Sequence, residues 1–303
     1  MSTASADTDT GEFHWPEDPL ISVQTLATWQ QKGRKLAIFD ASWHLPDLHR
    51  NARSEFEDAH IPNAGFFDID ALSDQSSPLP HMMQKRDDFA TSLGNLGITA
   101  DTPIVFYDNS QVRSSCRAWW MVKSLGHEHV YVLDGGMTSW RKATMPVRAG
   151  DIPQWAPKAY QPKDPQPYFI AADDIDTSQQ LVLDARSAGR FEGTEAEKRP
   201  GIRAGHIPGS FNRHYAAMFD RTGLFLPKAE LARFLGSRGN RPVVTTCGSG
   251  ITASILAFTL YRIGRKDVKV YDGSWTEWGN LDPDISGGEP RPIETGPARE
   301  RRQ

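Results

Sequence analysis

One cysteine stands in a sequence context suited to nucleophilic chemistry. Cys247 begins the segment 247–252, Cys-Gly-Ser-Gly-Ile-Thr, which follows the apolar run 243–246 and precedes a helical pattern over 252–263. Glycines let such a turn curl and direct its backbone N–H groups inward, and the N-terminus of the next helix adds a positive dipole. Both favour a thiolate over a thiol, and they would also hold the charge of a persulfide, Cys–S–S⁻. The segment, called the cysteine loop below, therefore predicts that Cys247 is a nucleophile that carries sulfur.

A cysteine-dependent phosphatase uses a similar loop and is the first alternative. Its loop carries an arginine at the sixth position after the cysteine, and this arginine clamps the phosphate. Ala253 occupies that position here. The loop has no cation of its own, so a phosphate group would be poorly bound.

The chain has only one other cysteine, Cys116. Two cysteines cannot build a disulfide framework or a cysteine-rich zinc site. Cys116 falls where a helix should have begun, and we expect it to be structural. A reducing cytoplasm, in which cysteines stay as thiols, fits this composition best.

An internal repeat shows which elements position the cysteine loop. Four segments of the first half recur in the same order in the second half. The matching pairs are 36–41 with 181–185, 60–64 with 206–210, 103–107 with 242–246, and 130–136 with 268–274. Short apolar runs bounded by Asp, Gly and Pro predict strands, and helical spacing between them predicts helices. The expected fold is α/β, with two tandem domains that each contain a mainly parallel, doubly wound sheet flanked by helices.

The proline-rich stretch between the halves predicts an extended, semi-rigid linker. The expected organisation is a disordered arm over 1–19, a first domain over 20–147, a linker over 148–168, a second domain over 169–283 and a flexible tail over 284–303.

Composition excludes several classes of protein. The 303 residues carry a net charge of -4, without the basic excess of a nucleic-acid binder. No apolar run approaches the roughly 18 residues that span a membrane, and the N-terminus lacks the pattern of a signal or transit peptide. We expect a cytoplasmic monomer that binds neither nucleic acid nor membranes.

The loop and the repeats resemble the tandem-domain rhodanese family. The resemblance rests on the duplicated halves, the His-Ile-Pro segments at 60–62 and 206–208, the cysteine loop, and Asp-Gly-Ser-Trp-Thr-Glu-Trp at 272–278. It implies a sulfurtransferase that needs no cofactor or metal. Sulfur would pass through a Cys247 persulfide to a thiol, to cyanide or to a thioredoxin-like protein.

The resemblance also bears on the sulfur donor. Thiosulfate-using members carry basic residues directly after the cysteine, whereas this chain has Gly248 and Ser249. That pattern is similar to members that take sulfur from 3-mercaptopyruvate and release pyruvate. Thiosulfate remains the alternative donor, and a non-catalytic rhodanese-like binding module is a further alternative that the presence of Cys247 disfavours.

Two arginines match the family's donor-binding positions. Arg190, in Gly-Arg-Phe, and Arg199, nine residues later, are implied to hold the carboxylate and keto oxygen of the donor. Arginine suits this role because its planar fork grips a carboxylate through two parallel bonds. Arg186 is expected to support the loop through ion pairs. The remaining substrate-binding residues are expected to be Gly248, Gly250, Ile251 and Thr252.

The resemblance implies a Ser-His-Asp relay that moves a proton on the substrate. Its serine is Ser249, and its histidine is expected to be His60, whereas His206 is expected to be structural. The position expected for the aspartate holds Asn51, and an amide cannot stabilise an imidazolium as a carboxylate does. Asp47 and Glu55 stay open as substitutes.

The first half lacks a nucleophile. Either Asp108 or Asn109 stands where its loop cysteine would be, depending on how the gap is drawn. We expect this half to be inactive and to form one wall of the cleft.

Overall fold

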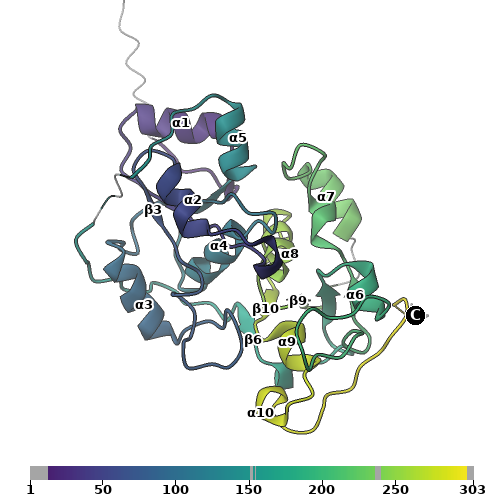
Figure 1. Cartoon of the computed structure of the whole chain (residues 1–303). Helices are drawn as coiled ribbons and strands as arrows, with labels where there is room; N and C mark the ends of the chain where they lie inside the picture. Colours follow the sequence, from purple (N-terminus) through teal and green to yellow (C-terminus); the bar gives the residue numbers. More distant parts are fainter. Residues whose placement is uncertain (1–12, 151–152, 154, 236–239, 299–303) are drawn as a thin grey trace, which may run out of the picture.

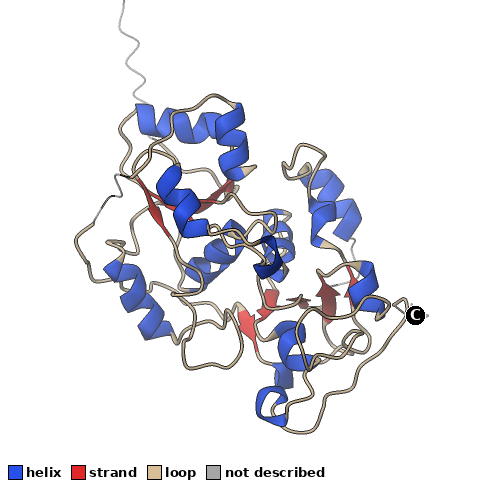
Figure 2. Ribbon diagram, in the orientation of Figure 1, coloured by secondary structure: helices blue, strands red, loops and turns tan. Residues whose placement is uncertain are grey.

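The computed structural model describes residues 13–150, 153, 155–235 and 240–298. Within these residues the chain forms two five-stranded sheets, and every strand pair in them is parallel. Figures 1 and 2 show the two sheets in separate halves of the molecule, each flanked by helices. The predicted α/β class and the duplication are confirmed.

The elements of the two halves follow each other in nearly the same order. The first half contains β1 (Leu20–Ile21), α1 (Val23–Gln31), β2 (Ala37–Asp40), α2 (Ala52–Asp58), β3 (Ala64–Phe66), α3 (Arg86–Asn95), β4 (Ile104–Tyr107), α4 (Ser115–Ser124), β5 (Val130–Leu133) and α5 (Gly136–Lys142). The second contains β6 (Phe169–Ile170), β7 (Leu181–Asp184), α6 (Ala188–Glu192), β8 (Phe211–Asn212), α7 (Lys228–Leu235), β9 (Val243–Thr246), α8 (Ala253–Arg262), β10 (Val268–Tyr271), α9 (Ser274–Trp278) and α10 (Pro283–Ser286). Short 3₁₀ turns lie at Pro46–Leu48, Ala172–Asp174 and Tyr215–Met218.

The strand orders β1-β5-β4-β2-β3 and β6-β10-β9-β7-β8 are the same arrangement twice. The central strand β9 is buried throughout, as expected for a parallel strand covered on both faces. Ligands of such sheets bind beyond the carboxyl ends of the strands. The cysteine loop begins at that end of β9.

The two halves share a packed interface formed by α4 and α8. The ring of Trp119 in α4 lies 5.0 Å from that of Phe258 and 4.9 Å from that of Tyr261, both in α8. Figure 1 shows these helices at the centre of the molecule, between the two sheets. Because each helix follows the loop at the end of its central strand, the interface also brings the two loops toward each other.

The described parts of both chain ends pack on the domains, contrary to the expected disordered arm over 1–19 and flexible tail over 284–303. Trp15 packs edge-on against Trp29, with 5.0 Å between ring centroids. At the other end, Trp278 donates a hydrogen bond to the carbonyl of Pro292, with a distance of 2.8 Å. Ion pairs of Asp18 and a backbone bridge between His206 and Glu294 hold these segments as well, and average composition does not reveal such contacts. Residues 1–12 and 299–303 lie outside the described residues.

The end of β2 carries a buried carboxyl group with an altered acidity. In the second half, Asp184 is paired with Arg186 at 2.5 Å, but Ser42 stands at the matching position of the first half. Asp40 therefore has no arginine beside it, and burial raises its pKa from the ordinary value of 3.8 to about 7. Without an arginine partner, the buried carboxyl group of Asp40 is costly to ionise.

Replacement of this acid should change how stability depends on pH. Because the pKa of Asp40 is raised in the folded state, its stabilising contribution is complete below about pH 4 and is lost as pH rises through about 7. Relative to Asp40→Asn, the wild type should lose about 2 kcal/mol of unfolding free energy between about pH 5 and pH 8. Urea unfolding at both pH values measures this difference, and parallel pH profiles for the two proteins would contradict it.

Candidate active site

Cys247 lies at the floor of a cavity between the two halves. Its exposed fraction is only 2 %, yet it lines a cavity of about 470 Å³. The first half contributes Trp43, Leu45, Pro46, Asp47 and Val112 to the lining. The second half contributes the cysteine loop except Gly250, residues between 186 and 202, and His214, Tyr215, Trp275 and Thr276. The thiol is therefore neither solvent-exposed nor enclosed in packed hydrocarbon.

Ser274 fastens the cysteine loop from below. Its hydroxyl oxygen accepts hydrogen bonds from the backbone N–H groups of Cys247, at 3.2 Å, and Gly250, at 3.1 Å. The same hydroxyl donates to the carbonyl of Tyr271 at 2.8 Å. One side chain thus joins both ends of the turn to the end of β10.

This serine has a backbone conformation that disfavours a side chain. Its φ is +50°, and the matching residue of the first half, Gly136, has a φ of +53°. Glycine adopts this conformation freely, whereas another residue is strained by about 1–3 kcal/mol. The strained serine therefore occurs in the second half, where its hydroxyl holds the cysteine loop, and the first half has glycine at this position.

The rest of the loop leaves amide groups available to an anion. Among the described residues, the N–H groups of Gly248, Ser249, Ile251 and Thr252 have no hydrogen-bond acceptor. All four residues line the cavity with Cys247. Unpaired amides of this kind stabilise negative charge on a bound group.

Gly250 differs from the other loop residues that were predicted to bind substrate. It does not line the cavity, because its N–H group is bound to Ser274 and its φ is +81°. An added Cβ would lie 3.1 Å from Nη1 of Arg117, a buried arginine of the first half. Gly250 serves the turn of the loop, and its contact with substrate stays a prediction.

Arg190 reaches the cavity and is held by a buried acid. Its Nη2 lies 2.5 Å from Oε2 of Glu197, and Arg186 binds the other oxygen of that carboxylate at 2.7 Å. Arg186 also pairs with Asp184, as the predicted supporting role requires. Glu197 therefore keeps one arginine partner even when Arg190 turns toward a ligand.

Arg199 is the cavity arginine without an acidic partner in the described part of the chain. Its Nη1 donates to the hydroxyl of Thr276 at 2.7 Å. Burial lowers the pKa of Arg199 and the nearby charge of Arg190 lowers it further, against the opposing effect of Cys247. Two cations near one thiol favour an anionic ligand.

The histidine predicted for the relay lies elsewhere. His60 is fully buried, and its Nδ1 is 2.8 Å from the carbonyl oxygen of Phe56. His206 makes the equivalent contact with the carbonyl oxygen of Phe191, also at 2.8 Å. Because the two His-Ile-Pro histidines make the same local contact, the structure assigns both the structural role that was expected only for His206.

His81 is the histidine that contacts Ser249. Its Nδ1 lies 3.0 Å from Oγ of Ser249, and its Nε2 lies 3.2 Å from Oδ1 of Asp70. Burial raises the pKa of Asp70, but the hydrogen bond and charge of His81 outweigh it, so the pKa is lowered. Nδ1 also lies 3.1 Å from the backbone carbonyl oxygen of Ser249, so the same ring nitrogen faces both oxygens of that serine. Ser249, His81 and Asp70 thus form a chain of contacts that joins the two halves, in the order expected for a Ser-His-Asp relay.

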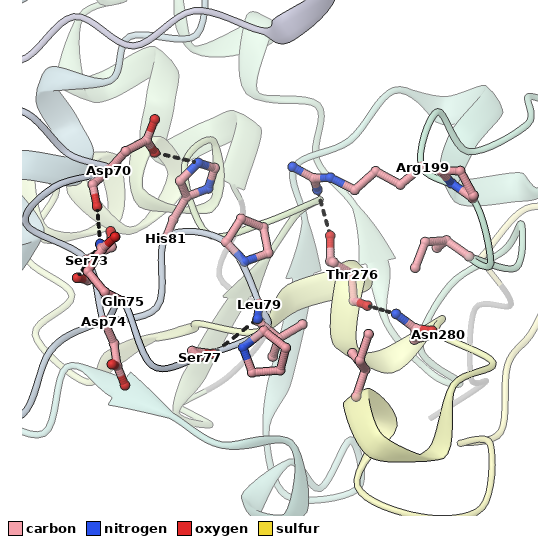
Figure 3. A pocket seen from close by; sticks show the side chains of 15 residues that line it. Asp70, Ser73, Asp74, Gln75, Ser77, Leu79, His81, Arg199, Thr276 and Asn280 are labelled. Carbon is pink, nitrogen blue, oxygen red and sulfur yellow. Dashed lines mark hydrogen bonds and ion pairs between the residues drawn. The ribbon is translucent and has the colours of Figure 1, made fainter.

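Figure 3 shows the end of this chain of contacts at which Asp70 binds His81. Asp70 and His81 face Arg199 and Thr276 across a second cavity of about 570 Å³. Arg199, Thr276 and Ile202 line both cavities. The carboxylate end of the relay thus opens on a different space from Cys247.

Asn51, at the position expected for the relay aspartate, and the two possible substitutes, Glu55 and Asp47, all have other partners. Asn51 caps the N-terminus of α2 by accepting from the N–H of Ser54 at 2.9 Å. Glu55 is bound by Arg50, and Asp47 pairs with Lys198 of the second half at 2.5 Å. None of the three contacts His60.

Both halves of the chain match the same family of domains. The model of the "Rhodanese-like domain" matches residues 22–143 and again residues 170–281. The chain belongs to the rhodanese family.

Individual relatives of this rhodanese span most of its length. The 3-mercaptopyruvate sulfurtransferase of Rattus norvegicus is 41% identical over 272 residues, which cover 86% of this chain and 91% of the relative. The thiosulfate sulfurtransferase of Gallus gallus is 36% identical over 276 residues, which cover 87% and 94%. The crystal structure of Tum1 protein from Saccharomyces cerevisiae has a TM-score of 0.79 at 29% identity and covers 91% of this chain and 100% of that chain. Relatives named for either donor are similar to it.

In the first rhodanese half, an aspartate side chain occupies the loop that matches the cysteine loop. The strand register aligns Tyr107 with Thr246, so Asp108 is the residue that replaces the cysteine. The carboxylate of Asp108 accepts from the N–H groups of Ser110 and Ser115, at 3.1 and 3.0 Å. An acid that satisfies the amides of its own turn leaves no place for a transferable sulfur.

Cys116 is fully buried in this half. Burial raises the pKa of its thiol well above the ordinary value, and the charge of Asp108 adds to the effect. It is a neutral core thiol, as expected for a structural cysteine.

The sequence carried one weak signal for His81. It lies between β3 and α3, inside the bridge of Ser73 with Met83. The matching segment between β8 and α7 has the equivalent bridge of Phe219 with Phe225 but no histidine inside it, so the repeated fold does not require this histidine. Among the described residues, no helix is both long enough and apolar enough to span a membrane.

Proposed function

We propose that this rhodanese is a 3-mercaptopyruvate sulfurtransferase that carries sulfur as a persulfide on Cys247. The observation that carries the proposal is one cavity lined by Cys247, Arg190 and Arg199, in which Ser249 is bonded to His81. The cations suit an anionic keto acid, and the relay suits a product that must gain a proton.

The donor's carboxylate and keto oxygen would be held by Arg190 and Arg199. Arg199 has only a hydroxyl partner, so a carboxylate improves its surroundings. Arg190 would exchange Glu197 for the donor, and Glu197 would stay paired with Arg186. The site therefore binds an anion without leaving a buried carboxylate alone.

The reaction breaks one bond and forms another. The Cys247 thiolate attacks the donor's sulfur, the C–S bond breaks, and its electron pair leaves with carbon as the enolate of pyruvate. That enolate takes up the proton released from the donor thiol, with Ser249 and His81 as the route, while the persulfide Cys–S–S⁻ remains. The unpaired loop amides at Gly248, Ser249 and Ile251 would stabilise the charged sulfur. An acceptor thiol, cyanide or a thioredoxin-like protein then removes the outer sulfur.

Thiosulfate is the second candidate donor because of the similarity to a thiosulfate sulfurtransferase. Thiosulfate releases sulfite, a stable anion that needs no proton at carbon. With thiosulfate as donor, the contacts of Ser249, His81 and Asp70 would have no proton to transfer to the product. The uncharged residues Gly248 and Ser249 also give a dianion no cation within the cysteine loop. Both features favour mercaptopyruvate.

The remaining proposals concern the setting of the enzyme. We keep the domain boundaries 20–147 and 169–283, which the two family matches support. Both cysteines are free thiols, which supports a reducing compartment such as the cytoplasm. We expect a monomer whose acceptor enters the cavity between the two halves.

A comparison of donors tests the proposed function. The ratio of kcat/KM for 3-mercaptopyruvate to that for thiosulfate should exceed about 10, because only the first donor uses the relay. Ser249→Lys should lower this ratio by about 10-fold or more, since it removes the relay hydroxyl and adds a cation beside the cysteine. Steady-state assays with cyanide as the common acceptor measure both values. A wild type that prefers thiosulfate would contradict the proposed donor.

A further inference from the structure

A fully buried arginine of the first half lies at the base of the active site. Arg117 in α4 has no exposed surface. Its Nη2 lies 2.7 Å from Oδ1 of Asp272 in the second half. The guanidinium also lies 4.8 Å from the ring centroid of Phe169. Burial of a charge is costly unless partners compensate it, so this position needs a reason beyond packing.

The partners of Arg117 hold the segment that contains His81. Arg117 Nη2 donates to the carbonyl oxygen of His81 at 2.5 Å. The other oxygen of Asp272 accepts from the N–H of Met83 at 2.5 Å. The ion pair therefore binds the backbone on both sides of residue 82. His81 itself has a φ of +63°, a conformation that must be held by its surroundings.

The same ion pair supports the cysteine loop. A Cβ on Gly250 would lie 3.1 Å from Nη1 of Arg117 and 3.3 Å from Asp272, so the loop rests directly on the pair. Asp272 is also two residues before Ser274, whose hydroxyl holds the amides of the loop. Arg117 thus touches both chain segments whose separation fixes the contact between His81 and Ser249.

We propose that Arg117 is a positioning residue for proton transfer. It sets the backbone of His81 against the cysteine loop, so that Nδ1 stays 3.0 Å from Oγ of Ser249. It does not line the cavity that contains Cys247, Arg190 and Arg199. The inference rests on the proposed function, because the relay is needed only where a carbon must be protonated.

Single-turnover kinetics separate positioning from general support. Loading of Cys247 from 3-mercaptopyruvate requires protonation of the enolate, whereas unloading of the persulfide to cyanide does not. Arg117→Met should slow loading by about 10-fold or more and leave unloading within about twofold. Arg117→Lys keeps the charge on a shorter side chain. Because one nitrogen, Nη2, makes both the His81 and the Asp272 contact, the lysine ammonium can keep part of them, and loading should slow by only about threefold. Quenched-flow mass spectrometry of the Cys247 peptide measures both steps.

An interface arginine whose side chain is 7% exposed is the matched control. Arg262 in α8 is bonded to Asp18 of the first half, at 3.0 and 3.2 Å, and has no contact with the His81 segment. Arg262→Met should leave the ratio of loading to unloading rates unchanged, even if it lowers the melting temperature.

The outcomes are distinct. A ratio that is unchanged in both Arg117 variants, or equal slowing of both steps, overturns the positioning role. If Arg117→Met does not fold, the ratio in Arg117→Lys decides. Failure of the wild type to load from 3-mercaptopyruvate would instead contradict the proposed function.

Discussion

Replacement of Cys247 by serine is expected to abolish sulfur transfer and to leave the fold intact. An alcohol at this place is not ionised and does not attack sulfur, so turnover should fall by more than ~10³-fold. The two side chains differ by one atom, and the amides of the loop are held by Ser274 and not by the thiol. Release of pyruvate measures activity, and circular dichroism and the melting temperature measure the fold.

Cys116→Ser is the control for this experiment. The raised pKa and full burial of Cys116 predict that its loss leaves activity within about twofold. After treatment of the wild type with 3-mercaptopyruvate, mass spectrometry should find one added sulfur on the peptide of Cys247 and none on that of Cys116. Retained turnover in Cys247→Ser would remove the basis of the mechanism.

The second large effect is expected at a histidine that the repeats do not predict. His81→Ala should lower kcat with 3-mercaptopyruvate by about 10²–10⁴-fold, because proton transfer through Ser249 loses its acceptor. KM should change little, since His81 contacts neither Arg190 nor Arg199. Steady-state kinetics with cyanide as acceptor measure both constants.

His60→Ala is the matched comparison. It should keep kcat within about twofold and lose about 1–3 kcal/mol of unfolding free energy, because the carbonyl of Phe56 loses a buried partner. Urea unfolding gives the second value. If His60→Ala, and not His81→Ala, removed the activity, the assignment of the relay would be wrong.

The fold and the nucleophile were predictable because both depend on local sequence. The runs 103–107 and 242–246 end at the loops that follow β4 and β9, and the glycines around Cys247 mark the second loop. Each signal lies within a few residues of the feature that it predicts. The arginines at 190 and 199 were found through the family resemblance, and they do line the cavity.

The relay was missed for a physical reason. His60 belongs to a motif present in both halves, and a repeated motif reports what both folds need. The residue that acts on Ser249 stands 168 positions away from it in sequence. Its approach depends on how the halves pack through α4 and α8, and no local pattern encodes that packing. The same is true of Arg117 and Asp272.

The turn at Ser274 has a consequence for how the two halves can change over time. The inactive half has glycine there, at almost the same φ, and an aspartate in place of the nucleophile. Restoring a cysteine at 108 would leave a loop without the hydroxyl that clips its amides. Two substitutions would be required, Asp108→Cys and Gly136→Ser. The serine at 136 would be strained by its positive φ and, without the cysteine, would support no nucleophile. No single substitution would therefore give the first half an active cysteine loop, and the difference between the two halves is expected to persist.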